Sequence, residues 1–184
     1  LNKTTKMEAD KETEVWYAMR ATYRRELDAM HLLEKENLGC FIPMQYKISI
    51  RKGKKVRALV PVVHNLVFVR STRKQLEEIK EAKGAILPIR YIMDCETQQP
   101  ITIPDVQMRS FIAVAGNCDQ QVVYLDPTTI NLKRGQRVRI TGGVFEGVEG
   151  EFVRIKDDRR VVVVIQGLMA VATAFIHPSL IEQI

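Results

Sequence analysis

Residues 133–150 read KRGQRVRITGGVFEGVEG, and this stretch decides the fold of the C-terminal part of the chain. Four of its glycines fall where short strands would reverse direction: Gly135, Gly143, Gly147 and Gly150. Glycine adopts the positive φ angles of tight turns without steric cost. The apolar residues between the glycines are expected to fill the interior of a small β-barrel: Val138, Ile140 and Phe145.

Further strand patterns follow this stretch and no helical periodicity interrupts them. The complete set of expected strands is 137–141, 151–155, 161–166 and 169–174, with turns at Gly142-Gly143, Asp157-Asp158 and Gly167. Several short strands in about fifty residues are typical of a small closed barrel. The polar segment 117–131, which contains Asp126-Pro127, reads as a linker ahead of a barrel domain at 132–184.

The region before the linker mixes strand and helix patterns. Runs of β-branched and aromatic residues predict strands at 15–20, 46–51, 56–60, 66–69 and 85–93. Apolar residues three or four apart predict helices at 24–37, 72–84 and 104–116, the second capped by Thr72. This order favours an α+β domain at 15–116, an antiparallel sheet flanked by helices, after a flexible N-terminus at 1–14.

The composition is that of a globular protein, with 184 residues, 46% hydrophobic and 27% charged, and a net charge of +6. That excess of basic residues is compatible with a polyanionic partner. The three cysteines are far apart, which argues against a structural zinc site and favours free thiols in a reducing cytosol. No apolar run is long enough to span a membrane, so we expect a cytoplasmic protein with no membrane partner.

Motifs for enzyme chemistry are missing. The sequence has no phosphate-binding loop of the G-x-x-x-x-G-K-[ST] type, and His31, His64 and His177 are widely spaced. No serine or cysteine motif marks a nucleophile. We therefore expect no enzyme, no catalytic residue, no cofactor and no metal.

The expected hairpin at 46–60 is the strongest lead from the residues themselves. It turns at Gly53 and carries six basic residues with no acidic one: Lys47, Arg51, Lys52, Lys54, Lys55 and Arg57. A basic β-ribbon can follow a phosphate backbone and release counterions from it. Equally, lysines on an exposed hairpin can serve only to keep it soluble and unable to pair edge to edge. Both interpretations stand at this point.

The glycine-rich stretch 133–150 resembles a KOW motif, although Val144 stands where many such motifs have proline. The segments before it follow the order of a NusG N-terminal domain: Trp16-Tyr17, Phe41-Ile42-Pro43-Met44, the basic hairpin and residues 65–69. Residues 15–184 as a whole therefore resemble the NusG family of transcription elongation factors. Several segments are similar to RfaH-type paralogues, and most of all to UpxY-type antiterminators of capsular polysaccharide operons.

The resemblance implies a NusG N-terminal (NGN) domain followed by an SH3-like KOW barrel. In this family the N-terminal domain grips the clamp helices of the largest RNA polymerase subunit, which suppresses pausing and termination. The KOW domain binds other partners, such as a small-subunit ribosomal protein or a termination factor. The implied function is a transcription elongation factor and antiterminator, and the alternative is a KOW-domain RNA-binding protein associated with the ribosome.

The resemblance also implies site residues. The apolar polymerase contact falls on Val63, Leu66 and Phe68, and a place in the buried core is an equal alternative for Phe68. Contacts to non-template DNA or nascent RNA fall on basic residues: Arg20, Arg24, Arg25, Lys52, Lys54, Lys55, Arg73 and Lys74. The base-reading loop of RfaH-type proteins is shortened here to residues 71–74, so phosphate contact is expected there instead of base recognition. The target operon, and whether the KOW domain docks or refolds, stay open.

Overall fold

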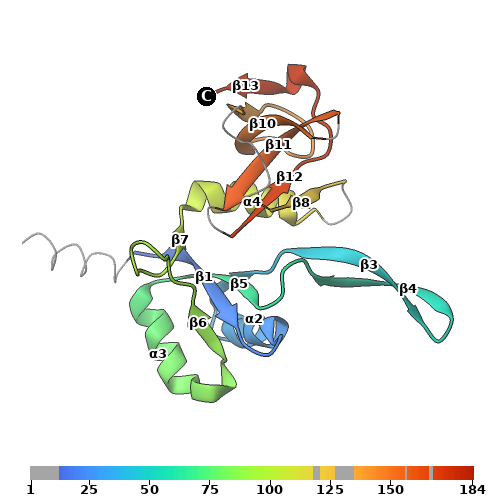
Figure 1. Cartoon of the computed structure of the whole chain (residues 1–184). Helices are drawn as coiled ribbons and strands as arrows, with labels where there is room; N and C mark the ends of the chain where they lie inside the picture. Colours follow the sequence, from blue (N-terminus) through green and yellow to red (C-terminus); the bar gives the residue numbers. More distant parts are fainter. Residues whose placement is uncertain (1–12, 118–120, 127–134, 156, 166–167) are drawn as a thin grey trace, which may run out of the picture. The chain divides into compact units, whose positions relative to one another are not determined.

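The computed structural model describes residues 13–117, 121–126, 135–155, 157–165 and 168–184 (Figure 1). The chain divides into two compact units, of which the first comprises Leu1–Ile42 and Val63–Asp105. The second comprises Pro43–Val62 and Val106–Ile184. Gln166 and Gly167, the expected end of a strand and the turn after it, lie outside the described residues, as do Lys133 and Arg134. Within the described part, no helix is long and apolar enough to cross a membrane.

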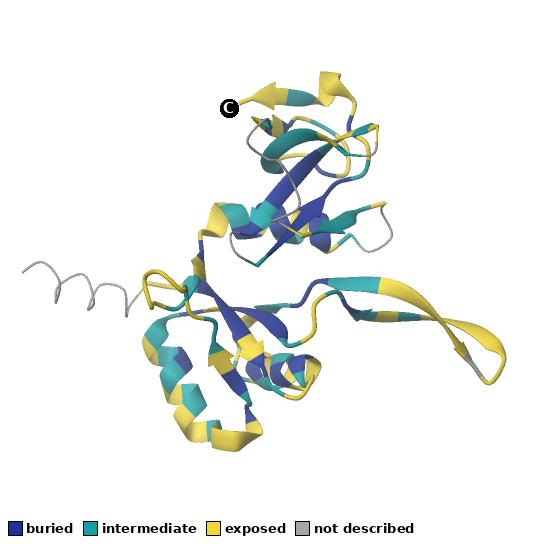
Figure 2. Ribbon diagram, in the orientation of Figure 1, coloured by how far each residue is buried: buried dark blue, intermediate teal, exposed yellow. Residues whose placement is uncertain are grey.

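The first unit is built on an antiparallel sheet with the strand order β2-β5-β1-β6, and β7 also pairs with β1. Its strands are β1 (Val15–Ala21), β2 (Gly39–Phe41), β5 (Leu66–Ser71), β6 (Ile89–Tyr91) and β7 (Thr102–Ile103). β1 and β5 lie in the middle, and Figure 2 shows them largely buried. Most side chains of these two strands are buried whichever way they point. Two-sided burial explains their unbroken apolar runs, Trp16 to Met19 and Leu66 to Val69.

The helices of the first unit are α2 (Glu26–Lys35) and α3 (Arg73–Lys83), followed by the short 3-10 helix η1 (Gly84–Ile86). The expected cap of α3 is confirmed, because the Thr72 hydroxyl accepts a hydrogen bond from the Gln75 N–H at 3.1 Å. α2 begins two residues later than expected, since Tyr23 and Arg24 have φ values of 58° and 55°, outside the helical region.

Two expectations about helix and strand ends were wrong. α2 ends at Lys35, two residues before the expected end at Asn37, which has a φ of 61°. The strand expected at 85–93 is reduced to β6, preceded by η1. Pro88 has no N–H to donate, which accounts for the strand beginning only after it.

The second unit contains a hairpin of β3 (Met44–Arg51) and β4 (Lys54–Pro61) and the helix α4 (Asp105–Ala115), whose first residue is counted with the first unit. The hairpin turn is Lys52-Gly53, with φ values of 49° and 75°. Positive φ at both turn residues matches the twist of a tight two-residue hairpin, so the expected role of Gly53 is confirmed.

A six-stranded antiparallel sheet makes up the rest of this unit, in the order β13-β9-β10-β11-β12-β8. Its elements are β8 (Val123–Leu125), β9 (Gln136–Ile140), β10 (Glu149–Ile155), β11 (Asp158–Ile165), β12 (Met169–Ala172), the 3-10 helix η3 (Pro178–Leu180) and β13 (Ile181–Gln183). β8 lies within the segment expected to be a linker and pairs with β12. The expected domain bounds and the closed barrel stay predictions.

The core of this sheet includes the residues expected from the glycine-rich stretch. Val138, Ile140 and Phe145 are buried, as expected. Gly143 and Gly147 have φ values of 85° and 82°, which confirms them as turn glycines. Gly150 is required for another reason, because a Cβ atom there would lie 2.5 Å from the backbone oxygen of Val162.

We expect Gly150→Ala to lower the free energy of unfolding by about 1–3 kcal/mol, because the backbone of β11 cannot move away cheaply. Gly142→Ala is the matched control, since its Cβ atom would meet the Leu180 side chain at 3.4 Å. That variant should stay within about 0.5 kcal/mol of the wild type. Urea unfolding of the full chain measures both, and equal stabilities would contradict the close approach at Gly150.

Candidate nucleic-acid interface

One face of the β3–β4 hairpin carries apolar and basic side chains next to one another, as its register shows. Directly opposed residues share a face, so Ile48 lies beside Arg57 and Ile50 beside Lys55. The described side chains from 46 to 57 are all exposed, as the hairpin end in Figure 2 shows. Lys52, Lys54 and Lys55 are therefore free to approach a phosphate backbone, while the side chain of Arg51 lies outside the description.

The sequence analysis did not single out two exposed isoleucines on this hairpin. Ile48 is 72% exposed and Ile50 is 74% exposed, although isoleucine is among the residues most often buried. Beside them the Arg57 guanidinium lies over the Tyr46 ring, 3.7 Å from its centre, a cation–π contact. The alternation from Tyr46 to Ile50 was the available signal, because it places the apolar side chains of this strand on one face.

The first unit separates the remaining basic residues into two groups. In the register of β1 against β5, Val15 pairs with Ser71 and Arg20 pairs with Leu66. Arg20 therefore lies at the opposite end of the sheet from Arg73 and Lys74, which follow Ser71. Five residues of strand correspond to roughly 17 Å, so the two groups do not form a single cluster.

The group at the Arg20 end is built where two loops meet. Asn65 accepts hydrogen bonds from the Ala21 N–H through its backbone oxygen, at 2.9 Å, and from the Arg24 N–H through Oδ1, at 2.8 Å. These bonds hold the loop after β1 against the loop before β5. Arg24 is exposed, and Arg25 forms an ion pair with Asp28 at 3.2 Å.

Behind these arginines lies a buried carboxylate. Glu26 is the first residue of α2, and its Oε1 lies 3.2 Å from Nδ1 of His64. Its Oε2 is buried without a hydrogen-bond partner among the described residues. The contact ties the start of α2 to the loop before β5, and so fixes the position of the neighbouring arginines.

The expected apolar contact is only partly at the surface. Val63 is 39% exposed, whereas Leu66 is 4% and Phe68 0% exposed. Of the three, only Val63 is at the surface in this conformation, and the polymerase contact at these residues stays a prediction. Leu66 and Phe68 belong to the central strand β5, and both faces of that strand are covered.

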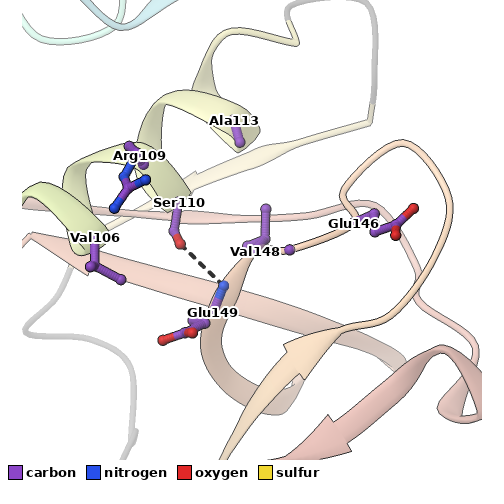
Figure 3. A pocket seen from close by; sticks show the side chains of 8 residues that line it. Val106, Arg109, Ser110, Ala113, Glu146, Val148 and Glu149 are labelled. Carbon is purple, nitrogen blue, oxygen red and sulfur yellow. Dashed lines mark hydrogen bonds between the residues drawn. The ribbon is translucent and has the colours of Figure 1, made fainter.

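The glycine turn before β10 lies against α4 within the second unit. A cavity of about 420 Å³ lies between them. Figure 3 shows the labelled residues that line it: Val106, Arg109, Ser110 and Ala113 of α4, and Glu146, Val148 and Glu149. The Ser110 hydroxyl accepts a hydrogen bond from the Glu149 N–H at 3.1 Å. The turn and α4 are therefore joined by this hydrogen bond.

The described residues hold no group of three or more histidine, cysteine or acidic side chains that could bind a metal ion. Cys40 and Cys95 are free thiols, and burial raises the pKa of Cys40 to about 12. At neutral pH the Cys40 thiol therefore stays protonated, the form that is a poor nucleophile.

Comparison with known proteins identifies one family. The family described as "Transcription termination factor nusG" (NusG) matches residues 14–112. Among solved structures the chain is similar to one titled "Domain interaction in Thermotoga maritima NusG", with 20% identity and a TM-score of 0.47. That similarity covers 94% of this chain and 98% of the other. No curated protein matches the chain.

We expect removal of three hairpin charges, in Lys52→Gln/Lys54→Gln/Lys55→Gln, to weaken nucleic-acid binding and reduce its salt dependence. Each lost phosphate contact lowers the slope of log K against log salt by about 0.9 on duplex DNA, so three lower it by roughly 2.7. Anisotropy titrations of a labelled duplex at several salt concentrations measure this slope.

The matched control is Arg137→Gln/Arg154→Gln/Arg159→Gln, which removes the same charge from exposed positions of the C-terminal sheet. An equal loss of slope in both triple variants would show that net charge, and not the hairpin, determines binding.

Proposed function

Because this chain belongs to the NusG family of transcription factors, which are not enzymes, we propose that it is an elongation factor that promotes readthrough of pauses and terminators. The family match over residues 14–112, more than half of the chain, is the observation that carries the proposal. Membership in this family confirms that the chain is not an enzyme. The family description names termination, and the antiterminating direction is our inference from the RfaH-like and UpxY-like segments.

We further propose that the chain acts on particular operons of the capsular polysaccharide type. Binding to the clamp helices would stabilise the elongating conformation of the polymerase. A ligand shifts an equilibrium only by its difference in affinity for the two states, so the factor must bind the closed clamp more tightly. Non-template DNA or nascent RNA would be held by the exposed basic residues.

The C-terminal sheet would act as a KOW barrel that binds a second partner, a small-subunit ribosomal protein or a termination factor. Its short antiparallel strands, glycine turns and buried Phe145 support that assignment. On the α4 side, the turn that contains Gly147 is already in contact with the helix. A partner would therefore bind the sheet elsewhere, or displace α4 from this turn.

The polymerase contact would centre on Val63, which is the exposed member of the expected set. Leu66 and Phe68 lie beneath the surface and would touch a partner only if a rearrangement uncovered β5. Their role in the present conformation is to hold the sheet together.

The alternative is a KOW-domain RNA-binding protein associated with the ribosome. The basic hairpin and the C-terminal sheet are compatible with it. The family match speaks against it, because residues 14–112 would then have no assigned role.

We expect Val63→Asp in the full chain to weaken binding to the isolated clamp-helix coiled coil of the cognate polymerase by tenfold or more, since it places a charge in an apolar contact. Ile86→Asp is the matched control, because Ile86 is 62% exposed in the same unit and outside the proposed contact. Calorimetry measures both affinities. Equal affinity of the two variants would move the contact away from Val63.

We also expect the wild-type chain to increase full-length RNA in a single-round transcription assay on a template with a pause site and a terminator. Increased termination would contradict the proposal that the chain promotes readthrough. No effect on transcription, together with salt-sensitive binding to ribosomal subunits, would favour the ribosomal alternative.

A further inference from the structure

The β3–β4 hairpin leaves both of its long edges open. Among the residues that the structure describes, β3 and β4 pair only with each other, over eight residues of each strand. In an antiparallel pair, the backbone N–H and C=O groups of alternate residues point away from the partner strand. The outer edge of β3 therefore offers a row of hydrogen-bonding groups on which another strand can pair.

A row of exposed apolar side chains follows this edge on one face of the hairpin. Ile48 and Ile50 point to the same face because side chains alternate along a strand, and both are exposed over more than two thirds of their surface. Tyr46 continues the row, with the Arg57 guanidinium over its ring. Apolar side chains along an open strand edge mark an interaction site or an aggregation hazard. A phosphate backbone alone does not account for them, since it gives isoleucine nothing to pack against.

The charges of the hairpin decide which strand can pair with this edge. Lys47 is exposed and lies on the face of β3 opposite to the isoleucines. Residues 46–60 contain no acidic residue at all. Across neighbouring strands, like charges oppose pairing and opposite charges stabilise it. A second copy of the hairpin would bring lysine against lysine, whereas a strand with carboxylates would be attracted.

We propose that the open edge of β3 binds an extended acidic segment of another protein as an added strand. The segment alternates apolar and acidic residues. Its apolar side chains lie beside Ile48 and Ile50, and its carboxylates lie on the other face, beside Lys47. In this mode of recognition, backbone hydrogen bonds supply affinity and the alternate side chains supply specificity.

The inference goes beyond the proposed function and does not depend on it. It uses the edge and the apolar face of β3, whereas the proposed nucleic-acid contact uses the lysines in and after the turn. An anionic lipid surface is the competing occupant, because it too takes up apolar and basic side chains together. The open edge favours the added strand, since a lipid surface offers no regular row of backbone donors and acceptors to β3.

The test uses the full chain and labelled eight-residue peptides with blocked ends, which match the length of β3. The main probe alternates glutamate and valine. One comparison peptide alternates glutamate and serine and so lacks the apolar face, and another alternates lysine and valine and so reverses the charge. In anisotropy titrations we expect the glutamate–valine peptide to bind about tenfold more tightly than either.

Two further peptides test whether the probe binds as a strand. One glutamate–valine peptide is N-methylated at every valine and the other at every glutamate. In an added strand only one of these two sets of N–H groups faces β3, because the groups alternate in direction. We therefore expect one methylated peptide to lose binding and the other to keep it.

Variants of the chain test the two faces of β3 separately. We expect Ile48→Ser/Ile50→Ser to weaken binding of the glutamate–valine peptide about tenfold and to leave duplex DNA affinity unchanged. Ile86→Ser/Val144→Ser is the matched control, because it removes two apolar side chains that are 62% and 66% exposed outside the hairpin. That variant should bind the peptide like the wild type.

Lys47→Glu reverses the charge on the other face. We expect it to weaken binding of the glutamate–valine peptide about fivefold and to strengthen binding of the lysine–valine peptide, since opposite charges across strands attract.

Several results would overturn the inference. These are no binding of the glutamate–valine peptide, equal affinity of the two methylated peptides, and equal affinity of the isoleucine variant and its control. Loss of duplex affinity in the isoleucine variant would assign the isoleucines to nucleic acid instead. Binding to phosphatidylserine vesicles that depends on the isoleucines, without peptide binding, would assign them to lipid. The transcription assay and the clamp-helix titration use none of these probes, so the proposed function stands or fails separately.

Discussion

The antiparallel pairing of β1 with β5 is the constraint on which the first unit depends. Its register runs from Val15 opposite Ser71 to Arg20 opposite Leu66, and both strands are buried along most of their length. A shift of one residue would exchange the two faces of a strand. The same register sends the loops after β1 and before β5 to one end of the sheet, and the start of α3 to the other. The basic surface of this unit is thus divided by its core.

The two units present positive charge in different ways. On the β3–β4 hairpin Lys52, Lys54 and Lys55 are exposed, on the same ribbon as the exposed Ile48 and Ile50. At the end of β1 the basic side chains lie on a rigid turn tied down by Asn65 and by the Glu26–His64 contact. An exposed ribbon suits contacts that follow a phosphate backbone. A rigid turn suits a single positioned contact, because little conformational entropy is lost on binding.

The turn at Tyr23 and Arg24 also shows how the fold supports an unfavourable local conformation. Each non-glycine residue with positive φ costs of order 1–3 kcal/mol where the structure imposes it. Burial of the β5 side chains can offset that cost, since a fully buried apolar side chain contributes about 1.5–3 kcal/mol. Leu66 to Val69 are all buried directly after Asn65. Strand β5 therefore anchors the residue that holds the turn, which is a structural role for Leu66 and Phe68.

The sequence by itself determined the features that depend on neighbouring residues: the Lys52-Gly53 turn, the Thr72 cap, the turn glycines Gly143 and Gly147, and the central strands. Each follows from φ/ψ preferences or side-chain hydrogen bonds within a few residues. Only the tertiary structure decided that Leu66 and Phe68 are buried, that Arg73 lies far from Arg20, and that Tyr23 stands exposed. These depend on strand pairing and on the hydrogen bond between Asn65 and Arg24, which are 41 residues apart. No local pattern encodes such a contact, because it exists only when β1 and β5 pair in this register.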